Sequence, residues 1–221
     1  MWQSKTDKDL ERDVRDELLF DPRVDVKAIA VSAKGGVVTL SGSVPTYAAK
    51  VVAYHDAERV GGVRAVVEHM DVSLPDMHAR SDADLAKAVA DALSWNVEVP
   101  ANKIRTAVRD GWVTLEGTVD WAYQRFAAEA ALRYLAGVKG VRDLIVVSSP
   151  QASVTDVKQH IKAALTRSAE VDARGITVET AEGGGVTLRG TVHSWAEREE
   201  AVRAAWATSG VRKVQDDLTY A

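Results

Sequence analysis

The 221-residue sequence contains no cysteine, which excludes disulfide bonds and thiolate metal sites and leaves stability to the packed cores. It also lacks a basic excess, because its formal net charge is -4, and this excludes a basic field for nonspecific nucleic-acid binding. No run approaches the roughly 18–20 apolar residues that cross a bilayer. The polar first residues lack the apolar segment of a secretory signal. These absences predict a soluble, most simply cytoplasmic protein, with a periplasmic location as the alternative if a signal was removed.

What the sequence does contain is one segment repeated three times. The motif Val-Thr-Leu-x-Gly-[Ser/Thr]-Val occurs at 38–44, 113–119 and 186–192, and a Gly-Val pair follows each motif glycine at the same distance. We interpret six glycines as structural, the motif glycines because a Cβ would clash there. They are Gly42, Gly62, Gly117, Gly137, Gly190 and Gly210. Short linkers at 74–80 and 148–152 divide the chain into modules 1–74, 75–149 and 150–221.

Each copy has the same predicted order of elements. It opens with a capping-box-like helix start at Thr6, Ser81 or Ser153, followed by apolar residues at every fourth position. A short strand, a glycine turn, an alternating strand, a second helix with small residues and a closing strand follow. The order α-β-β-α-β predicts an α+β protein of three tandem modules. In each, two helices cover a three-stranded mixed sheet whose closing strand runs parallel to the one before it.

The closing segment carries a further motif, Gly-Val-x-x-Val-x-[Glu/Asp]-x-apolar, at 62–70, 137–145 and 210–218. Together with the strand motif and the alanine-bearing second helix, it resembles the BON domain (bacterial osmotically inducible protein Y and nodulation) in all three copies. The resemblance implies a mostly envelope-associated protein linked to osmotic and envelope stress. Phospholipid binding is the activity most often proposed for this family, and no enzymatic role is established.

Catalytic and cofactor motifs are not indicated. The run 183–185 lacks the Gly-Lys-[Ser/Thr] ending of a phosphate-binding loop and is interpreted as a turn. The five histidines form neither an i, i+4 pair nor a cluster with carboxylates, so no metal site is expected. No serine is marked as a nucleophile. We therefore expect no enzyme activity, no cofactor and no nucleic-acid partner.

Aromatic residues differ between the copies, which makes the copies internal controls. Trp206 matches Glu58 and Arg133, so we expect its ring to be exposed to solvent. Aromatic residues beside arginine are typical of membrane interfaces. The predicted lipid or partner contacts are Trp121, Arg125, Phe126, Arg133, Tyr134, Trp195 and Trp206. Packing between modules is the alternative, and since no copy has a basic excess, any membrane contact should be weak and salt-sensitive.

The second copy has an unusual sheet. Its closing strand contains the apolar run 144–147 where the other copies alternate, and Trp112 lies on the nominally polar side. A strand that is apolar on both faces is usually covered on both faces. We therefore predict that another module, or a second chain in a homo-oligomer, covers the face that carries Trp112, Leu144 and Val146.

The leading hypothesis is a non-enzymatic, stress-associated binding protein that contacts a phospholipid membrane or an envelope-associated partner. One alternative is a soluble sensor of a small ligand or a cation of the potassium type, which the family resemblance also implies. A protein–protein scaffold is the other alternative.

Overall fold

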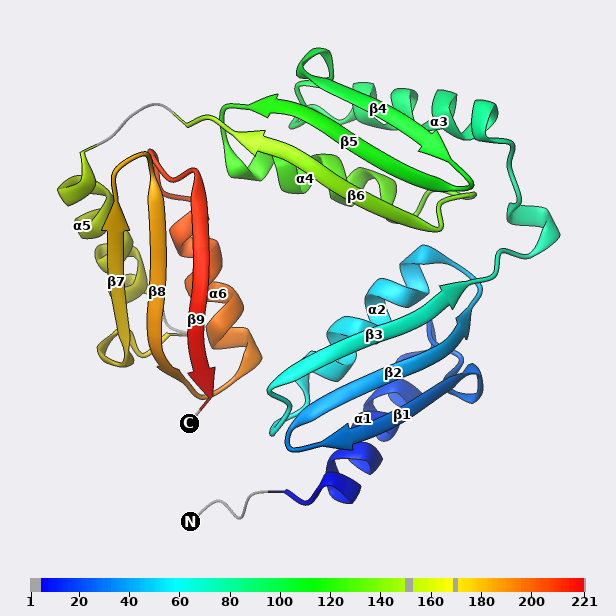
Figure 1. Cartoon of the computed structure of the whole chain (residues 1–221), viewed down its shortest axis with the longest axis horizontal. Coiled ribbons are helices and arrows are strands. Elements are labelled where there is room, and N and C mark those ends of the chain that lie inside the picture. The colour runs from blue at the N-terminus through cyan, green and yellow to red at the C-terminus, as the bar shows by residue number, and fades with distance from the viewer. Residues whose placement is uncertain (1–4, 150–152, 169–170, 221) are drawn as a thin grey trace. The chain divides into compact units, whose positions relative to one another are not determined.

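The computed structural model describes residues 5–149, 153–168 and 171–220. They form three modules, each built on its own three-stranded sheet (Figure 1). The predicted α+β class and the order α-β-β-α-β are confirmed in every module. Part of the second predicted linker, residues 150–152, lies outside the described residues.

In module 1 the sheet has the order β1-β2-β3. Its elements are α1 (Asp7–Phe20), η1 (Val26–Ala28), β1 (Ile29–Lys34), β2 (Val37–Val44), α2 (Tyr47–Arg59) and β3 (Ala65–Val72). Strand β2 is antiparallel to β1 and parallel to β3, so Val38 pairs with Ala33 on one side and with Val66 on the other. The parallel closing strand is the one that the sequence predicts.

Module 2 repeats this plan with the sheet order β4-β5-β6. Its elements are η2 (Asp76–His78), α3 (Asp82–Trp95), η3 (Ala101–Lys103), β4 (Ile104–Arg109), β5 (Trp112–Val119), α4 (Ala122–Leu132) and β6 (Gly140–Val147).

Module 3 has the sheet order β7-β8-β9 and the same register as module 1. Its elements are α5 (Val154–Arg167), η4 (Ala173–Gly175), β7 (Ile176–Ala181), β8 (Gly185–Val192), α6 (Trp195–Trp206) and β9 (Lys213–Tyr220).

The first helix of each module begins at a hydroxyl cap. The side-chain oxygens of Thr6, Ser81 and Ser153 accept the backbone N–H three residues later, at 3.2, 3.1 and 3.0 Å. In the first two modules the aspartate at that position accepts the hydroxyl proton. The carboxylate therefore orients the capping hydroxyl, where the sequence pattern predicted a second bond to a backbone N–H.

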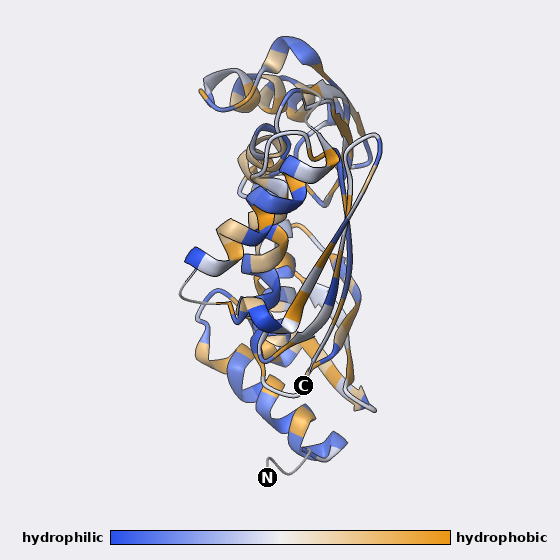
Figure 2. Ribbon diagram, turned by 90° about the vertical axis from the view of Figure 1, so that its left-hand side faces the viewer, coloured by the Kyte–Doolittle hydropathy of each residue, from blue (hydrophilic) through white to orange (hydrophobic). Residues whose placement is uncertain are grey.

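The core of each module lies between its two helices and one face of its sheet (Figure 2). The apolar residues at every fourth position of the first helix are buried, as are alternate residues of the second strand. Ala128 and Ala201 are fully buried, so the second helix packs closely on the sheet. The opposite face of each sheet carries no helix of its own module.

The motif glycine of the second strand stands where the chain passes very close to the loop before the first strand. At Gly117, φ is +146° and a Cβ would lie 2.2 Å from the carbonyl oxygen of Lys103. A side chain is therefore excluded at this position by both conformation and space. Gly62, Gly137 and Gly210 also have positive φ, at +102°, +99° and +91°.

Candidate functional site

An ion pair between the second helix and the closing strand recurs in all three modules. It joins Lys50 to Glu68 at 2.9 Å, Arg125 to Asp143 at 2.5 Å and Arg198 to Asp216 at 2.7 Å. In each case the carboxylate also accepts the backbone N–H of the residue two positions later. The pair therefore fixes the helix to the strand in every module.

Arg125, a predicted lipid contact, belongs to this repeated pair, and so its guanidinium already has a partner. The sequence held the signal, because a basic residue in the second helix and an acidic residue in the closing motif stand at equivalent positions in all copies.

The outward face of α4 carries an aromatic stripe, defined as Tyr123, Phe126 and Tyr134. Their side chains are 54%, 44% and 71% exposed. The spacing of three residues places Tyr123 and Phe126 on one face of α4, and Tyr134 lies in the turn that follows the helix. At the equivalent positions module 1 has Ala48, Val51 and Arg59, and module 3 has Ala196, Glu199 and Ala207. The stripe is therefore specific to module 2. Sequence reasoning found Phe126 and Tyr134 but missed Tyr123.

The end of module 2 from which the stripe starts is also apolar. Trp95, at the end of α3, is 83% exposed, and Val97 in the loop that follows is fully exposed. An ion pair of 2.6 Å between Lys103 and Asp120 holds the segment before β4 against the loop before α4. We call Trp95, Val97 and the aromatic stripe together the aromatic surface.

Sequence comparison between the copies would have found this end of the module. Phe20 is the counterpart of Trp95 and is equally exposed, whereas module 3 has Arg167 at the same position.

Trp121 and Arg133, also predicted contacts, lie at the two ends of α4 and are partly buried. The backbone N–H groups of Asp120 and Trp121 donate to the side-chain oxygen of Gln124, both at 3.1 Å. This bond fixes the loop that carries the Trp121 side chain.

In module 3, Glu197 replaces Gln124. It is buried and accepts the backbone N–H groups of Asp172 and His193 at 2.8 and 2.6 Å. Burial alone would raise the pKa of Glu197, but these bonds lower it below its usual value. The role of this position is therefore to join two loops.

Trp206 does not lie as the sequence predicts. Its side chain is partly buried and packs against the core of module 3, and its ring also meets the Phe126 ring edge-on, with the two centroids 6.0 Å apart. The residues at the matching positions of modules 1 and 2, Glu58 and Arg133, are also only partly exposed. Long charged side chains can cover apolar surface with their stems, so a polar residue in one copy does not make the position solvent-facing in another. Trp195, at the start of α6, is partly buried as well.

The outer face of the module 2 sheet presents Trp112, Leu144 and Val146, which are 47%, 50% and 60% exposed. The Trp112 ring lies over Gly140, where a Cβ would be 2.4 Å from it. The ring thus covers backbone that the glycine leaves bare. The covering of this face by another module or a second chain remains a prediction.

The substitution Val146→Lys tests whether this face makes a contact between chains. Because Val146 is exposed, we expect the stability of the monomer to change by no more than about 0.5 kcal/mol. A charge in an apolar interface would instead lower self-association markedly. Analytical ultracentrifugation and chemical unfolding, measured together, separate the two effects. Unchanged stability with unchanged self-association would contradict the predicted contact.

Module 1 places a charged cluster between α1 and α2. One carboxylate oxygen of the buried Asp56 is paired with Arg59, which also lies 3.3 Å from Glu17. The other oxygen of Asp56 has no hydrogen-bond partner among the described residues. Burial raises the pKa of Asp56, and the nearby Arg59 opposes this shift only in part.

Within residues 5–149, 153–168 and 171–220, no three or more His, Cys, Asp or Glu side chains are grouped so that they could hold a metal ion. In the same ranges, no helix has the length and apolar character needed to span a bilayer.

Comparisons with known sequences and structures identify the family of this chain. It is 33% identical over 147 residues to osmotically-inducible protein Y of Escherichia coli strain K12, an alignment that covers 62% of this chain and 71% of that protein. Among solved structures, it is similar to CdsD, a structural protein of the type III secretion system of Chlamydia trachomatis. There the identity is 15%, the coverage is 96% of this chain and 92% of that one, and the TM-score is 0.27. The BON domain model matches residues 6–73, 81–149 and 153–221. The chain therefore belongs to the BON domain family and contains three copies of the domain.

Proposed function

We propose that this protein is a non-enzymatic, stress-associated binding protein of the bacterial envelope that attaches to the surface of an anionic phospholipid membrane. The observation that carries the proposal is the aromatic stripe of module 2, in which Tyr123 and Tyr134 are more than half exposed and Phe126 is 44% exposed although its ring also meets Trp206 edge-on. The other two modules have no aromatic residue at these positions. Aromatic rings at the end of a module suit the membrane interface, because they are apolar bodies and tyrosine adds a polar tip.

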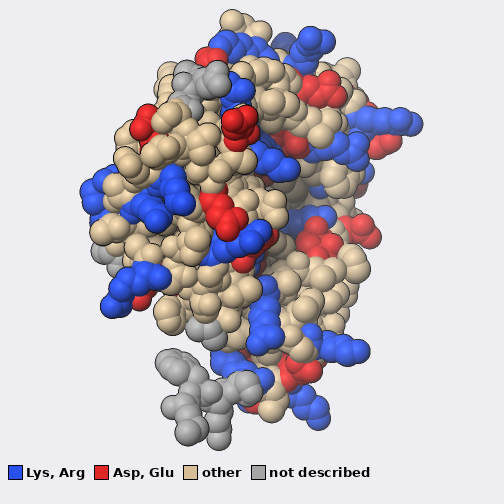
Figure 3. All heavy atoms as spheres, turned by 60° about the vertical axis from the view of Figure 1, so that its left-hand side comes forward, with Lys and Arg blue, Asp and Glu red and all other residues tan. Residues whose placement is uncertain are grey.

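The small binding energy expected from these rings favours reversible attachment to the membrane. Each ring that leaves water contributes at most about 2–3 kcal/mol. Charge adds little, since the sequence has no basic excess, and the face drawn in Figure 3 mixes Lys and Arg with Asp and Glu. Arg133 lies beside Tyr134, and each such residue near an anionic surface contributes only about 1 kcal/mol. We therefore infer weak, salt-sensitive binding.

The stress association is supported by the relative named osmotically-inducible protein Y. The proposal that the protein is not an enzyme is supported by the features that all three modules share. These are glycines at tight approaches, apolar cores and the helix-to-strand ion pair, each of which has a structural role.

Co-sedimentation with vesicles of phosphatidylglycerol and phosphatidylcholine, at low and at physiological salt, tests the proposal. Wild type is compared with the variant Tyr123→Ser/Phe126→Ser/Tyr134→Ser. We expect the variant to bind at least tenfold more weakly, because losing even about 1.4 kcal/mol of ring burial has that effect. The matched control is Leu144→Ser/Val146→Ser, which removes exposed apolar groups from the opposite side of the same module and should bind as wild type does.

Two results would contradict the membrane proposal: no sedimentation of wild type with anionic vesicles at low salt, or equal binding by the stripe variant. Circular dichroism of each variant checks that it is folded. Loss of binding in both variants would show that the contact is not confined to the aromatic surface.

A further inference from the structure

Two carboxylates of module 1 share one guanidinium between α1 and α2. Glu17 of α1 and Asp56 of α2 both accept from the same nitrogen of Arg59, Nη2. The Asp56 side chain is only 3% exposed, whereas the Arg59 side chain is half exposed. Water therefore screens the cation, while the buried anion has lost its hydration. One screened positive charge faces two negative charges, one of which is buried.

The second oxygen of Asp56 adds to this imbalance. Within the described part of the chain, no group donates a hydrogen bond to Oδ2 of Asp56. An ionised carboxylate that leaves water needs hydrogen-bond donors to replace its hydration, and its two oxygens can only accept. A protonated carboxyl carries no charge and is buried at a lower cost. The geometry therefore suits a proton on Oδ2.

The other charged groups near Asp56 have partners of their own. Just after α1, the Asp21 carboxylate accepts from Nε of Arg23 at 2.9 and 3.1 Å, so Arg23 is bonded to Asp21. Asp16 of α1 is exposed to solvent. Farther along the two helices, further charged groups form separate pairs: Asp13 with Lys5 at 2.8 Å, and His55 with Glu58 at 3.3 Å. The cation that neutralises Asp56 is therefore Arg59, which Glu17 shares.

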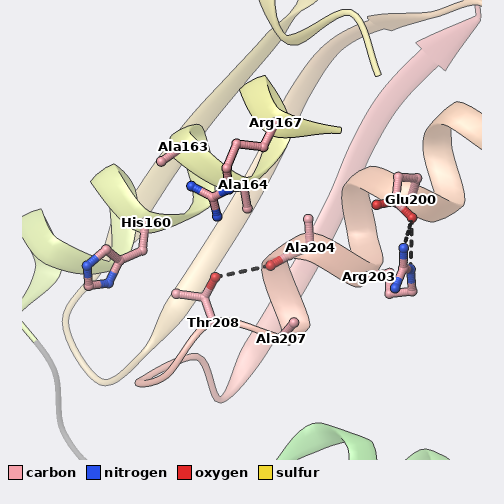
Figure 4. A pocket seen from close by; sticks show the side chains of 9 residues that line it. All are labelled: His160, Ala163, Ala164, Arg167, Glu200, Arg203, Ala204, Ala207 and Thr208. Atoms are coloured by element: carbon pink, nitrogen blue, oxygen red, sulfur yellow. Dashed lines mark hydrogen bonds and ion pairs between the residues drawn. The ribbon is translucent and has the colours of Figure 1, made fainter. Parts of the chain in front are cut away.

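The other two modules show that the fold does not require these two carboxylates. Both modules have alanine at the positions of Glu17 and Asp56: Ala92 and Ala131 in module 2, Ala164 and Ala204 in module 3. In module 3 these alanines border a groove of about 360 Å³ between α5 and α6 (Figure 4). Apolar residues in place of a buried ion pair are often neutral or stabilising. The carboxylates of module 1 therefore point to a role other than folding.

We propose that Asp56 is a proton-binding site that makes the packing of α1 against α2 depend on pH. With the proton bound, Arg59 neutralises Glu17 and no unbalanced charge is buried between the helices. Without it, the two carboxylates repel each other and compete for Arg59, so the helix pair is less stable. This site goes beyond membrane attachment through the aromatic surface and does not depend on it.

The direction of the pH dependence follows from the environment of Asp56. Burial raises the pKa of Asp56 above its usual value, so the folded module binds this proton more tightly than the unfolded chain does. The stabilisation is therefore fully present below the pKa of an aspartate in the unfolded chain. It is lost as the pH rises through the pKa of the folded module.

Hydrogen exchange of the full chain, measured by mass spectrometry from about pH 4 to about pH 8, tests the proposal. Wild type is compared at each pH with Asp56→Asn, which keeps an oxygen for Arg59 and removes the titration. We expect the protection of α1 and α2 in wild type, relative to the variant, to fall by about threefold or more as the pH rises. One proton can change this ratio by at most about tenfold per pH unit.

Two further variants serve as controls. The guanidinium of Arg23 lowers the pKa of Asp21 to about 2, so Asp21 is ionised in the folded module throughout this range. Asp21→Asn should therefore keep the pH dependence of wild type. Glu17→Ala/Asp56→Ala gives module 1 the alanines of the other modules, and it should fold and lose the dependence. Should Asp56→Asn not fold, this double variant provides the same comparison.

A pH dependence of opposite sign would overturn the proposal. If Asp56 were the anion of a stabilising pair with Arg59, the protection of wild type relative to Asp56→Asn would fall as the pH is lowered. Equal pH dependence of the two proteins would overturn it as well. The stripe variant Tyr123→Ser/Phe126→Ser/Tyr134→Ser should behave as wild type in this experiment, so failure of the membrane proposal leaves this one intact.

Discussion

Replacing Gly190 with alanine is expected to destabilise module 3 by about 3–5 kcal/mol, enough to unfold a small domain. The residue has φ of +128°, and a Cβ would lie 1.9 Å from the carbonyl oxygen of Gly175. The conformational strain costs about 1–3 kcal/mol, and moving backbone to relieve the clash costs a similar amount. Hydrogen exchange measured by mass spectrometry, segment by segment, would show loss of protection throughout 153–168 and 171–220, the described residues of module 3.

Gly183→Ala is the matched control for that substitution. Gly183 also has positive φ, +81°, but a Cβ there would have nothing within 4 Å. Its cost should therefore be limited to conformational strain, about 1 kcal/mol. If the two substitutions cost the same, the close approach to Gly175 is not what requires the glycine at position 190.

Asp143→Ala should destabilise module 2 by about 2–3 kcal/mol. The Asp143 side chain is only 11% exposed, and it holds both the Arg125 guanidinium and the backbone N–H of Ile145, the latter at 2.9 Å. Its removal leaves the partly buried Arg125 guanidinium and the N–H of Ile145 without their acceptor. Leaving buried groups unpaired lowers the free energy of unfolding by more than the ion pair adds to it. Chemical unfolding of single and double variants with Arg125→Ala would give the coupling energy directly.

The comparison substitution is Asp120→Ala. It breaks the Lys103–Asp120 pair, both of whose side chains are well exposed, so water screens it and the expected loss is within about 0.5 kcal/mol. A coupling energy for Arg125 and Asp143 as small as that of this surface pair would show that the recurring ion pair does not fix the second helix to the sheet.

The sequence by itself determined the module and its repetition. The same pattern of glycines and apolar residues, present three times, predicted the helices, the mixed sheet and the order of elements. This was possible because the main-chain conformation at Gly117 or Gly190 depends on local residue type. Burial along a helical stripe likewise depends on the spacing of apolar residues. Comparison of the copies also picked out Phe126 and Tyr134, which differ from their counterparts on an exposed helix face.

Only the tertiary structure decided which side chains face which neighbours. Trp206 packs on its own core, Arg125 is held by Asp143, and the groove of module 3 is open because alanines on two separate helices face each other. In each case the deciding group comes from another element, at a distance in sequence that no local spacing encodes. Whether a side chain is exposed or paired with a charge depends on residues of other elements. Both therefore follow from the packing of the whole module.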